Sequence, residues 1–383
     1  MEVHVFRMSS VASPMPYSCA WDGPQTLVLA FFAPDFVLLP APLERLRVAF
    51  PRSYLLGCST GGGFIGPSVE DHSVAVAVMR FTSTRLCMAQ AHVPSGPAAS
   101  REAGESLGRA LAAPDLKGVF VLSDGLNMSG SELVNGFNAA LPSHVKVSGA
   151  MAADGERFKN TYTLVAGPGE PVRILDHQVG AVGFCGDSIR LTHGSGGGWS
   201  PFGLERCVTR SRGKIVFELD GKPALQLYKN YLGDQAHGLP ATAMSFPLAI
   251  LDKAVNKSEM LVRSVLGVNE EAQSLIFAGD IPEGSTVQLM HCHIDRLIEG
   301  AAGATDKLGK VAASPALTIA VSCVGRRMSM RERTEEGLEA ILDALPEKTP
   351  LVGFFDYGEL SPLSSGFCQF QNQTVALTLI QEV

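Results

Sequence analysis

An arginine and a glutamate near the end of the chain could together hold a small zwitterion. Arg326 offers a planar guanidinium that can donate two hydrogen bonds to a carboxylate, and Glu359 could receive an ammonium group. Tyr357, Asn372 and Gln373 could orient the same ligand by hydrogen bonds. These residue types predict a site for an amino-acid-like molecule. The alternative is that Arg326 and Glu359 pair with each other as a buried salt bridge.

Two predicted strands must position these side chains. Residues 350–356 are mostly apolar and lead into a polar turn, and residues 317–323 form a second apolar run that ends at Cys323, just before Arg326. Cys323 therefore belongs to the predicted ligand site. The segment between the strands has the spacing of an amphipathic helix, with Leu338, Ile341, Leu342 and Leu345 on one face. We expect the polar residues to meet at the mouth of a crevice along the last sheet edge.

The same unit of strand, helix and strand appears at two earlier places in the chain. One copy covers residues 27–63 and the other covers residues 118–155, where Ser129 and Glu132 have capping-box spacing. Each of the three second strands carries a glycine just before the chain turns polar: Gly57, Gly149 and Gly353. Internal duplication explains this similarity, and so does the general pattern of strand-helix-strand units.

Several cysteine and histidine residues are candidates for other chemistry. Cys58 and Cys323 lie at predicted strand ends near polar turns, where the pKa of a thiol can be lowered. An enzyme that uses either thiol is therefore one alternative, although no histidine is placed by the sequence as its base and buried inert thiols are common. The run 291–293 (His-Cys-His) offers at most two ligands on one strand face, so we predict no metal site.

A glycine-rich run divides the chain into two predicted parts. Residues 1–25 are rich in Ser, Pro and small residues and suggest an irregular lead-in. The run 193–203 contains Trp199 and Phe202 among its glycines, which indicates an ordered hinge rather than a nucleotide-binding loop. We expect parts at residues 26–200 and 201–383. The fold class is mixed α/β (α+β), with mixed sheets built from strand-helix-strand units.

Composition excludes several classes of partner. The chain has 383 residues, 46% of them hydrophobic, and a net charge of −7. Nucleic-acid binding needs a clustered positive face, which this charge pattern lacks. No apolar run is long enough to span a bilayer and the N-terminus does not resemble a secretory signal, so we expect no membrane partner. Eight scattered cysteines without a Cys-x-x-Cys pair favour free thiols in the cytoplasm.

Many short motifs occur in the order typical of one family. In the first part these are Gly57–Thr60, Ser123–Gly125 and Gly149–Gly155. In the second part they are Gly196–Trp199, Pro201–Gly203, Glu218–Ala224, Phe277–Asp280, Pro282–Gly284, Ser322–Arg326, Gly358–Glu359 and Asn372–Thr374. The chain resembles FIST-domain proteins, with an N-terminal and a C-terminal FIST part, over most of residues 25–380. Two positions depart from the family pattern: Gly61–Gly63 stands where Ala-Gly-Glu is common, and Gln371 stands where His is common.

The resemblance implies a sensory function. FIST proteins are proposed to bind small molecules such as amino acids and to report to a signalling partner, and we see no output segment in this chain. We therefore expect signalling in trans to a partner such as a histidine kinase. Some bacterial members are haem-binding nitric-oxide sensors, which makes haem an alternative ligand. Haem requires an axial ligand, for which His193 beside Trp199 is the first candidate and His237 and His72 follow.

Overall fold

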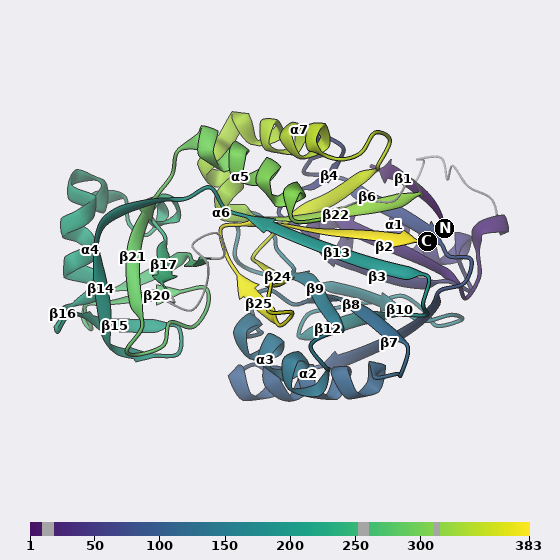
Figure 1. Cartoon of the computed structure of the whole chain (residues 1–383), viewed down its shortest axis with the longest axis horizontal. Helices are drawn as coiled ribbons and strands as arrows, with labels where there is room; N and C mark the ends of the chain where they lie inside the picture. Colours follow the sequence, from purple (N-terminus) through teal and green to yellow (C-terminus); the bar gives the residue numbers. More distant parts are fainter. Residues whose placement is uncertain (10–18, 252–259, 310–314) are drawn as a thin grey trace.

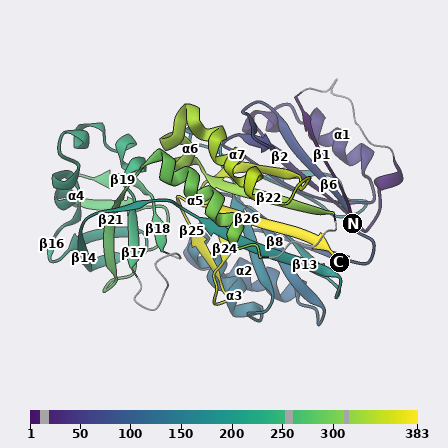
Figure 2. The same cartoon turned by 45° about the horizontal axis from the view of Figure 1, so that its top comes forward.

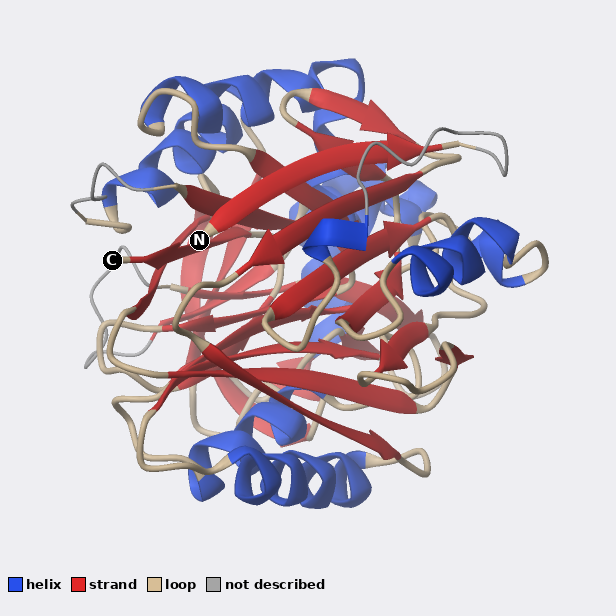
Figure 3. Cartoon of the chain, turned by 90° about the vertical axis from the view of Figure 1, so that its right-hand side faces the viewer, coloured by secondary structure: helices blue, strands red, loops and turns tan. Residues whose placement is uncertain are grey.

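The computed structural model describes residues 1–9, 19–251, 260–309 and 315–383. Three six-stranded sheets enclose one apolar core, and helices cover their outer faces (Figure 1). A fourth sheet of eight strands forms a separate unit at one end of the molecule (Figure 2). Figure 3 shows the strands in the middle of the larger body and the helices around them. The predicted mixed α/β class with mixed sheets is confirmed.

The first sheet has the order β1-β6-β2-β3-β10-β11. Its strands are β1 (Glu2–Met8), β6 (Val74–Arg80), β2 (Thr26–Phe32), β3 (Tyr54–Ser59), β10 (Thr163–Ala166) and β11 (Arg173–Leu175). Helix α1 (Ala41–Ala49) packs on its outer face. Every residue of β2 is buried because the sheet is covered on both faces, which explains why this strand is a continuous apolar run rather than an alternating one.

The second sheet has the order β7-β12-β8-β9-β24-β25. Its strands are β7 (Arg85–His92), β12 (Gln178–Cys185), β8 (Leu116–Ser123), β9 (Lys146–Met151), β24 (Gly358–Pro362) and β25 (Cys368–Gln371). Helices α2 (Pro97–Leu111) and α3 (Gly130–Ala140) cover it. The hydroxyl of Ser129 accepts a hydrogen bond from the Glu132 amide at the start of α3, so the predicted helix start is confirmed.

The third sheet has the order β13-β26-β22-β23-β4-β5. Its strands are β13 (Ile189–Gly196), β26 (Val375–Glu382), β22 (Ala316–Cys323), β23 (Leu351–Asp356), β4 (Gly63–Ile65) and β5 (Ser68–Glu70). Helices α5 (Ile294–Asp306) and α7 (Thr334–Ala344) cover it, and α6 (Val324–Met330) follows β22 directly. The predicted helix around Leu338 is therefore present, and the two arginines after Cys323 lie in α6.

The three sheets repeat one arrangement. In each, two central parallel strands are linked by a helix: β2-α1-β3, β8-α3-β9 and β22-α7-β23. The hairpin that follows each second strand joins a different sheet: β4-β5 pairs with β23, β10-β11 with β3, and β24-β25 with β9. The units thus exchange hairpins in a cycle. This shared topology favours internal repetition as the explanation of the similar units.

The repeated glycine has a steric reason. Gly57, Gly149 and Gly353 each lie opposite a residue of the neighbouring parallel strand, and a Cβ atom at these positions would lie 2.2, 1.8 and 1.9 Å from that residue's carbonyl oxygen. The paired residues are Ala30, Val121 and Ala320. No side chain fits at such distances, so glycine is required at the same point of each repeat.

The fourth sheet belongs to a unit inserted between β13 and α5. Its strands in order are β18 (Leu261–Arg263), β17 (Leu248–Leu251), β21 (Thr286–His291), β14 (Ser200–Arg212), β15 (Ile215–Leu219), β20 (Ser274–Phe277) and β19 (Val265–Asn269), with β16 (Lys222–Pro223) beside β15. Helix α4 (Ala224–Leu232) packs on it to form a separate apolar cluster. We call residues 200–291 the inserted unit and the rest of the described chain the three-sheet body.

The prediction of an irregular lead-in requires correction. Residues 2–8 are not an irregular lead-in but form β1, where Val3 and Val5 pack against the core. Strands from both sides of the predicted boundary at residue 200 share two of the sheets. None of the helices in the described ranges has the length and apolar character that crossing a bilayer requires.

Candidate functional site

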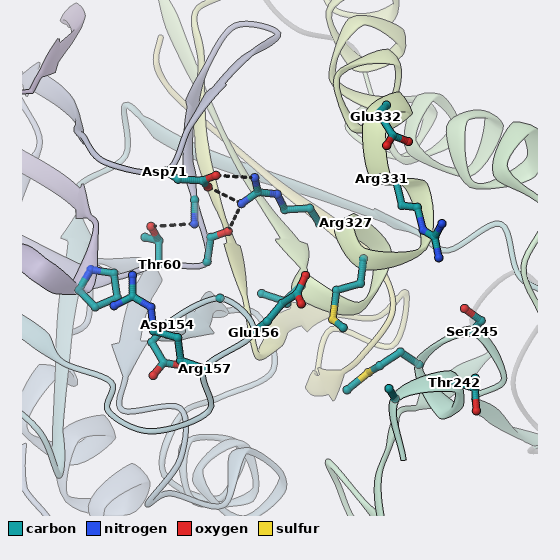
Figure 4. A pocket seen from close by; sticks show the side chains of 18 of the residues that line it. Thr60, Asp71, Asp154, Glu156, Arg157, Thr242, Ser245, Arg327, Arg331 and Glu332 are labelled. Atoms are coloured by element: carbon teal, nitrogen blue, oxygen red, sulfur yellow. Dashed lines mark hydrogen bonds and ion pairs between the residues drawn. The ribbon is translucent and has the colours of Figure 1, made fainter. Parts of the chain in front are cut away.

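A cavity of about 1060 Å³ lies where the three-sheet body meets the inserted unit (Figure 4). Its walls come from residues 60–62 after β3, residues 154–157 after β9 and residues 324–332 after β22, so the carboxyl ends of strands from all three repeats converge there. Such ends are common places for ligand sites in sheets with parallel strands. Residues 241–246 of the inserted unit form the remaining wall.

One wall depends on the glycines that depart from the family pattern. Arg327 donates to both carboxylate oxygens of Asp71, with 3.0 Å from Nη2 to Oδ2, and also donates to the Gly61 carbonyl. This pair lowers the pKa of Asp71. Gly62 lies against this ion pair, and a Cβ atom at Gly62 would be 2.4 Å from Nη1 of Arg327. The glycine therefore lets the ion pair lie against the backbone.

A second wall is a loop held in place by a buried carboxylate. Asp154 accepts hydrogen bonds from the backbone amides of Phe158, Lys159 and Asn160, each at 2.9 Å, and from the Tyr357 hydroxyl. The carboxylate thus accepts hydrogen bonds from loop amides that backbone carbonyls would accept in a helix or strand. The loop is a fixed part of the cavity.

Arg157 ties this loop to the first repeat. Its guanidinium donates to the two carboxylate oxygens of Asp35 at 2.8 and 3.2 Å, and the pair lowers the pKa of Asp35. The side chain of His72 lines the cavity nearby, with its Nδ1 atom 3.7 Å from Asp35. Two of the cavity's arginines, Arg157 and Arg327, are therefore already engaged by carboxylates.

Three charged side chains of the cavity are available to a ligand. Within the described ranges, Arg331, Glu156 and Glu332 form no ion pair, and all three are exposed to solvent. Arg331 lies at the end of α6 with φ 51° and ψ −121°, a conformation that non-glycine residues rarely adopt. Strained backbone of this kind often occurs at functional sites. The cavity thus offers one guanidinium and two carboxylates that are free of ion pairs within the described residues.

The FIST N domain matches residues 26–222, and the FIST C domain matches residues 224–362. The chain belongs to the FIST family. The resemblance seen in the short motifs is thereby confirmed. FIST domains are sensory modules associated with small-ligand signal transduction, and not catalytic domains.

Other comparisons carry less information. An uncharacterised protein of Methanocaldococcus jannaschii is 26% identical over 288 residues, which cover 67% of this FIST chain and 52% of the relative. This chain therefore spans about half the length of that relative. A chorismatase structure (TM-score 0.34, 7% identity) and a cyanuric acid hydrolase from A. caulinodans (TM-score 0.38, 10% identity) each cover 99% of this chain and 98% of their own. These scores are too low to support an argument.

The residues predicted to hold the ligand lie behind the cavity walls of this FIST protein. Cys323, Arg326, Glu359, Asn372 and Gln373 are buried and Tyr357 is half-buried, and none of them lines the cavity. The expected position at an open crevice mouth is therefore wrong, because strand pairing and α6 turn these side chains inward. Their binding role itself stays a prediction.

The guanidinium of Arg326 forms hydrogen bonds with backbone carbonyls. It donates to the carbonyl oxygens of Gly197 and, at 2.9 Å, Leu297, and burial lowers the pKa of its guanidinium to about 10. No ion pair joins Arg326 to Glu359 within the described residues, so the salt-bridge alternative is also not observed. Arg326 instead links the hinge to α5.

Glu359 forms a buried pair with Asp356. None of the four carboxylate oxygens has a protein hydrogen-bond partner of normal geometry within the described residues, although Thr374 is close enough to lower the pKa of Glu359 somewhat. Burial raises the pKa of both groups, that of Glu359 to about 8, and for Asp356 the neighbouring Glu359 adds to the rise. At neutral pH the pair therefore holds at least one proton.

The three histidines considered as haem ligands lie in different parts of the fold. The pKa of His193 is lowered to about 3 by burial and then by Lys146, and this residue does not line the cavity. The indole nitrogen of Trp199 donates to the Gln373 carbonyl at 2.6 Å, so this ring anchors the hinge. His237 is exposed in a 3₁₀ turn. His72 lines the cavity among charged side chains, and the haem alternative stays a prediction.

The His-Cys-His run and the thiols considered as nucleophiles lie in different parts of the fold. The rings of His291 and His293 lie 4.6 Å apart, on one side of the strand end as expected. No group of three or more His, Cys, Asp or Glu residues suited to a metal is found in the described part of the chain. Burial raises the pKa of the thiols of Cys58 and Cys323, and nearby carboxyls raise both further. Neither thiol is therefore activated as a nucleophile.

The sequence did not reveal which residues line the cavity. Arg331, Asp71 and Glu156 belong to no motif, and they meet only because loops of different repeats converge. One signal was present: Asp154 and Gly155 close the Gly149–Gly155 motif, which leads directly into the cavity wall.

Proposed function

We propose that this FIST protein is a sensor for a small amino-acid-like molecule that binds in the cavity between the three-sheet body and the inserted unit. The observation that carries the proposal is that both units line one cavity of about 1060 Å³, near the upper size of ordinary small-molecule sites. Arg331 can bind a carboxylate, and Glu156 can receive an ammonium group. A zwitterion satisfies both charges.

Ligand binding can be read out through the contacts between the two units. The Gln373 side-chain amide donates to the Met244 carbonyl at 3.0 Å, and Arg263 of the inserted unit donates to the Phe370 carbonyl at 2.8 Å. Met244 also lines the cavity, so a bound ligand and this contact share one wall. A ligand that prefers one relative position of the units shifts the population toward it.

The buried residues predicted for the ligand act, in this proposal, as positioning residues. Tyr357 holds the loop at Asp154, and Gln373 holds the wall at Met244. Arg326 and Cys323 fix the start of α6, while Glu359 and Asn372 lie behind it. Signalling in trans to a partner such as a histidine kinase, in the cytoplasm, completes the proposal and is supported by the family alone.

A thermal-stability screen with a panel of amino acids tests the site. We expect at least one amino acid to raise the melting temperature of the wild-type protein, because a ligand that binds only the native state stabilises it. Arg331→Gln and Glu156→Gln should each reduce this shift by weakening one end of the zwitterion. Arg333→Gln is the matched control, because Arg333 pairs with Asp295 and Glu336 and does not line the cavity.

Two results would contradict the proposal. The amino-acid class is wrong if no member of the panel changes the melting temperature. The location is wrong if an amino acid stabilises the wild type and both cavity variants to the same extent.

A further inference from the structure

Two free cysteines that are far apart in the sequence lie close together on the second sheet. Cys87 is in the edge strand β7, and Cys185 is in the neighbouring strand β12. Their Sγ atoms are 4.0 Å apart, although 98 residues separate them in the chain. Neither cysteine lines the cavity described above, so this pair is independent of the proposed ligand site.

The strand register explains the approach of the two thiols. Cys87 lies opposite Gly183, and Cys185 lies two residues further along the same face of β12. A Cβ atom at Gly183 would be 2.6 Å from the Cys87 sulfur, so the missing side chain leaves room for Cys87 to lean over the glycine toward Cys185. Diagonal neighbours of this kind are within reach of each other in antiparallel sheets.

We propose that Cys87 and Cys185 form a redox-active dithiol that is converted to a disulfide by small-molecule disulfides. The sulfur atoms must approach by about 2 Å to reach a bonded distance. Strand β7 can permit this movement because it is paired on one side only, and the pairing of β12 with β8 shifts register between Phe184 and Cys185. The product would fasten the edge strand covalently to the sheet.

The reaction is a thiol–disulfide exchange in two steps. The Cys87 thiolate attacks one sulfur of the small disulfide, forms a mixed disulfide and releases one small thiolate. Cys185 then attacks the Cys87 sulfur, forms the protein disulfide and releases the second small thiol. Cys87 is the attacking residue because it is partly exposed, whereas Cys185 is buried. Two protein thiols are oxidised, and one disulfide is reduced to two thiols.

The residues around Cys87 and Cys185 control how fast the two thiols are oxidised. Burial raises the pKa of both thiols, that of Cys185 to about 12, while the guanidinium of Arg85 acts in the opposite direction on each. The reactive thiolate is therefore a minor species at neutral pH. Oxidation should accelerate with pH, by at least about tenfold between pH 7 and pH 9.

Oxidation of the full chain with oxidised glutathione tests the proposal. We expect the linked Cys87 and Cys185 peptides to weigh about 2 Da less than the two reduced peptides together, whereas the exposed thiol of Cys207 gains glutathione. The number of thiols that can be titrated after denaturation should fall by at least two from eight. Peptide mapping should find Cys87 linked to Cys185, and dithiothreitol should restore all thiols. Because these measurements use the wild-type protein, they do not depend on the folding of any variant.

Two variants separate this pair from other thiols. Cys185→Ser should stop at the first step and retain glutathione on Cys87, whereas Cys207→Ser, which removes an exposed thiol, should form the disulfide as the wild type does. The proposal is overturned if all eight thiols remain titratable at pH 9, or if the disulfide found joins any other pair of cysteines.

Discussion

The Tyr357 hydroxyl donates a hydrogen bond to the Asp154 carboxylate, and this contact joins segments 203 residues apart. Tyr357 lies between β23 and β24 of the third repeat, whereas Asp154 follows β9 of the second repeat. The same hydroxyl donates to the Gly155 carbonyl at 2.8 Å, and the Phe158 ring stacks on the tyrosine at 4.6 Å. One side chain therefore connects two repeats at the cavity wall.

Tyr357→Phe should loosen this wall without removing its aromatic contact. We expect the free energy of unfolding to fall by about 1–2 kcal/mol, because a buried carboxylate loses a donor. Amide hydrogen exchange should increase at residues 155–160 more than elsewhere. Tyr162→Phe is the control, since no hydrogen bond of its hydroxyl is found within the described residues. Unchanged exchange in the loop would show that Asp154 alone holds it.

Gly62→Ala should destabilise the opposite wall. The position has φ +115°, and the added Cβ would collide with the Arg327–Asp71 ion pair. We expect a loss of about 1–3 kcal/mol in urea denaturation. Gly303→Ala in α5 is the control: a Cβ atom at Gly303 would meet no heavy atom within 4 Å in the described part of the chain, so alanine should leave stability unchanged or raise it. Equal stability of Gly62→Ala and wild type would refute the steric argument.

Glu359→Gln should change how stability depends on pH. In the native protein Glu359 keeps its proton up to about pH 8, but the unfolded chain releases it near the ordinary value of 4.5. The native state therefore binds more protons between these values, and the free energy of unfolding falls as pH rises through this window. The variant removes this contribution, and above pH 7 it should be more stable than the wild type by about 1–3 kcal/mol.

The control for this measurement is Glu347→Gln, which alters an exposed carboxyl. Its denaturation midpoints should follow those of the wild type from pH 4 to pH 8. If Glu359→Gln also keeps the wild-type slope, Glu359 is ionised in the native state, and the charges of the buried Arg326 and Arg263 stabilise it.

Arg326→Met should destabilise the protein by about 2–4 kcal/mol, because the buried carbonyls of Gly197 and Leu297 lose a charged donor. Chemical denaturation of the two proteins without any ligand should show this difference in the free energy of unfolding. Arg333→Gln again serves as a control, since Arg333 is partly exposed and bonds to surface carboxylates. A variant that is as stable as the wild type but no longer binds amino acids would instead restore Arg326 as a direct ligand contact.

Most elements of the three repeats could be predicted from local pattern. Strands such as β2 and β22 are continuous apolar runs because both faces of their sheets are covered, and the repeated glycines mark the close approach of neighbouring backbones. The short strand β1 could not be predicted in the same way, because a run of Ser and Pro residues follows it and hides its alternating pattern. The residue types around Arg326 and Glu359 predict a cluster of polar side chains, but they do not reveal that these side chains are buried.

The sequence alone determined the family, the strand-helix-strand units and the glycines that their pairing requires, because each depends on residues close together in the chain. Only the tertiary structure decided that hairpins are exchanged among three sheets, that Arg326 and Glu359 face inward, and that Arg331 and Glu156 face a shared cavity. Exposure and contact between distant loops depend on how whole sheets pack, and no local spacing of residues encodes that packing.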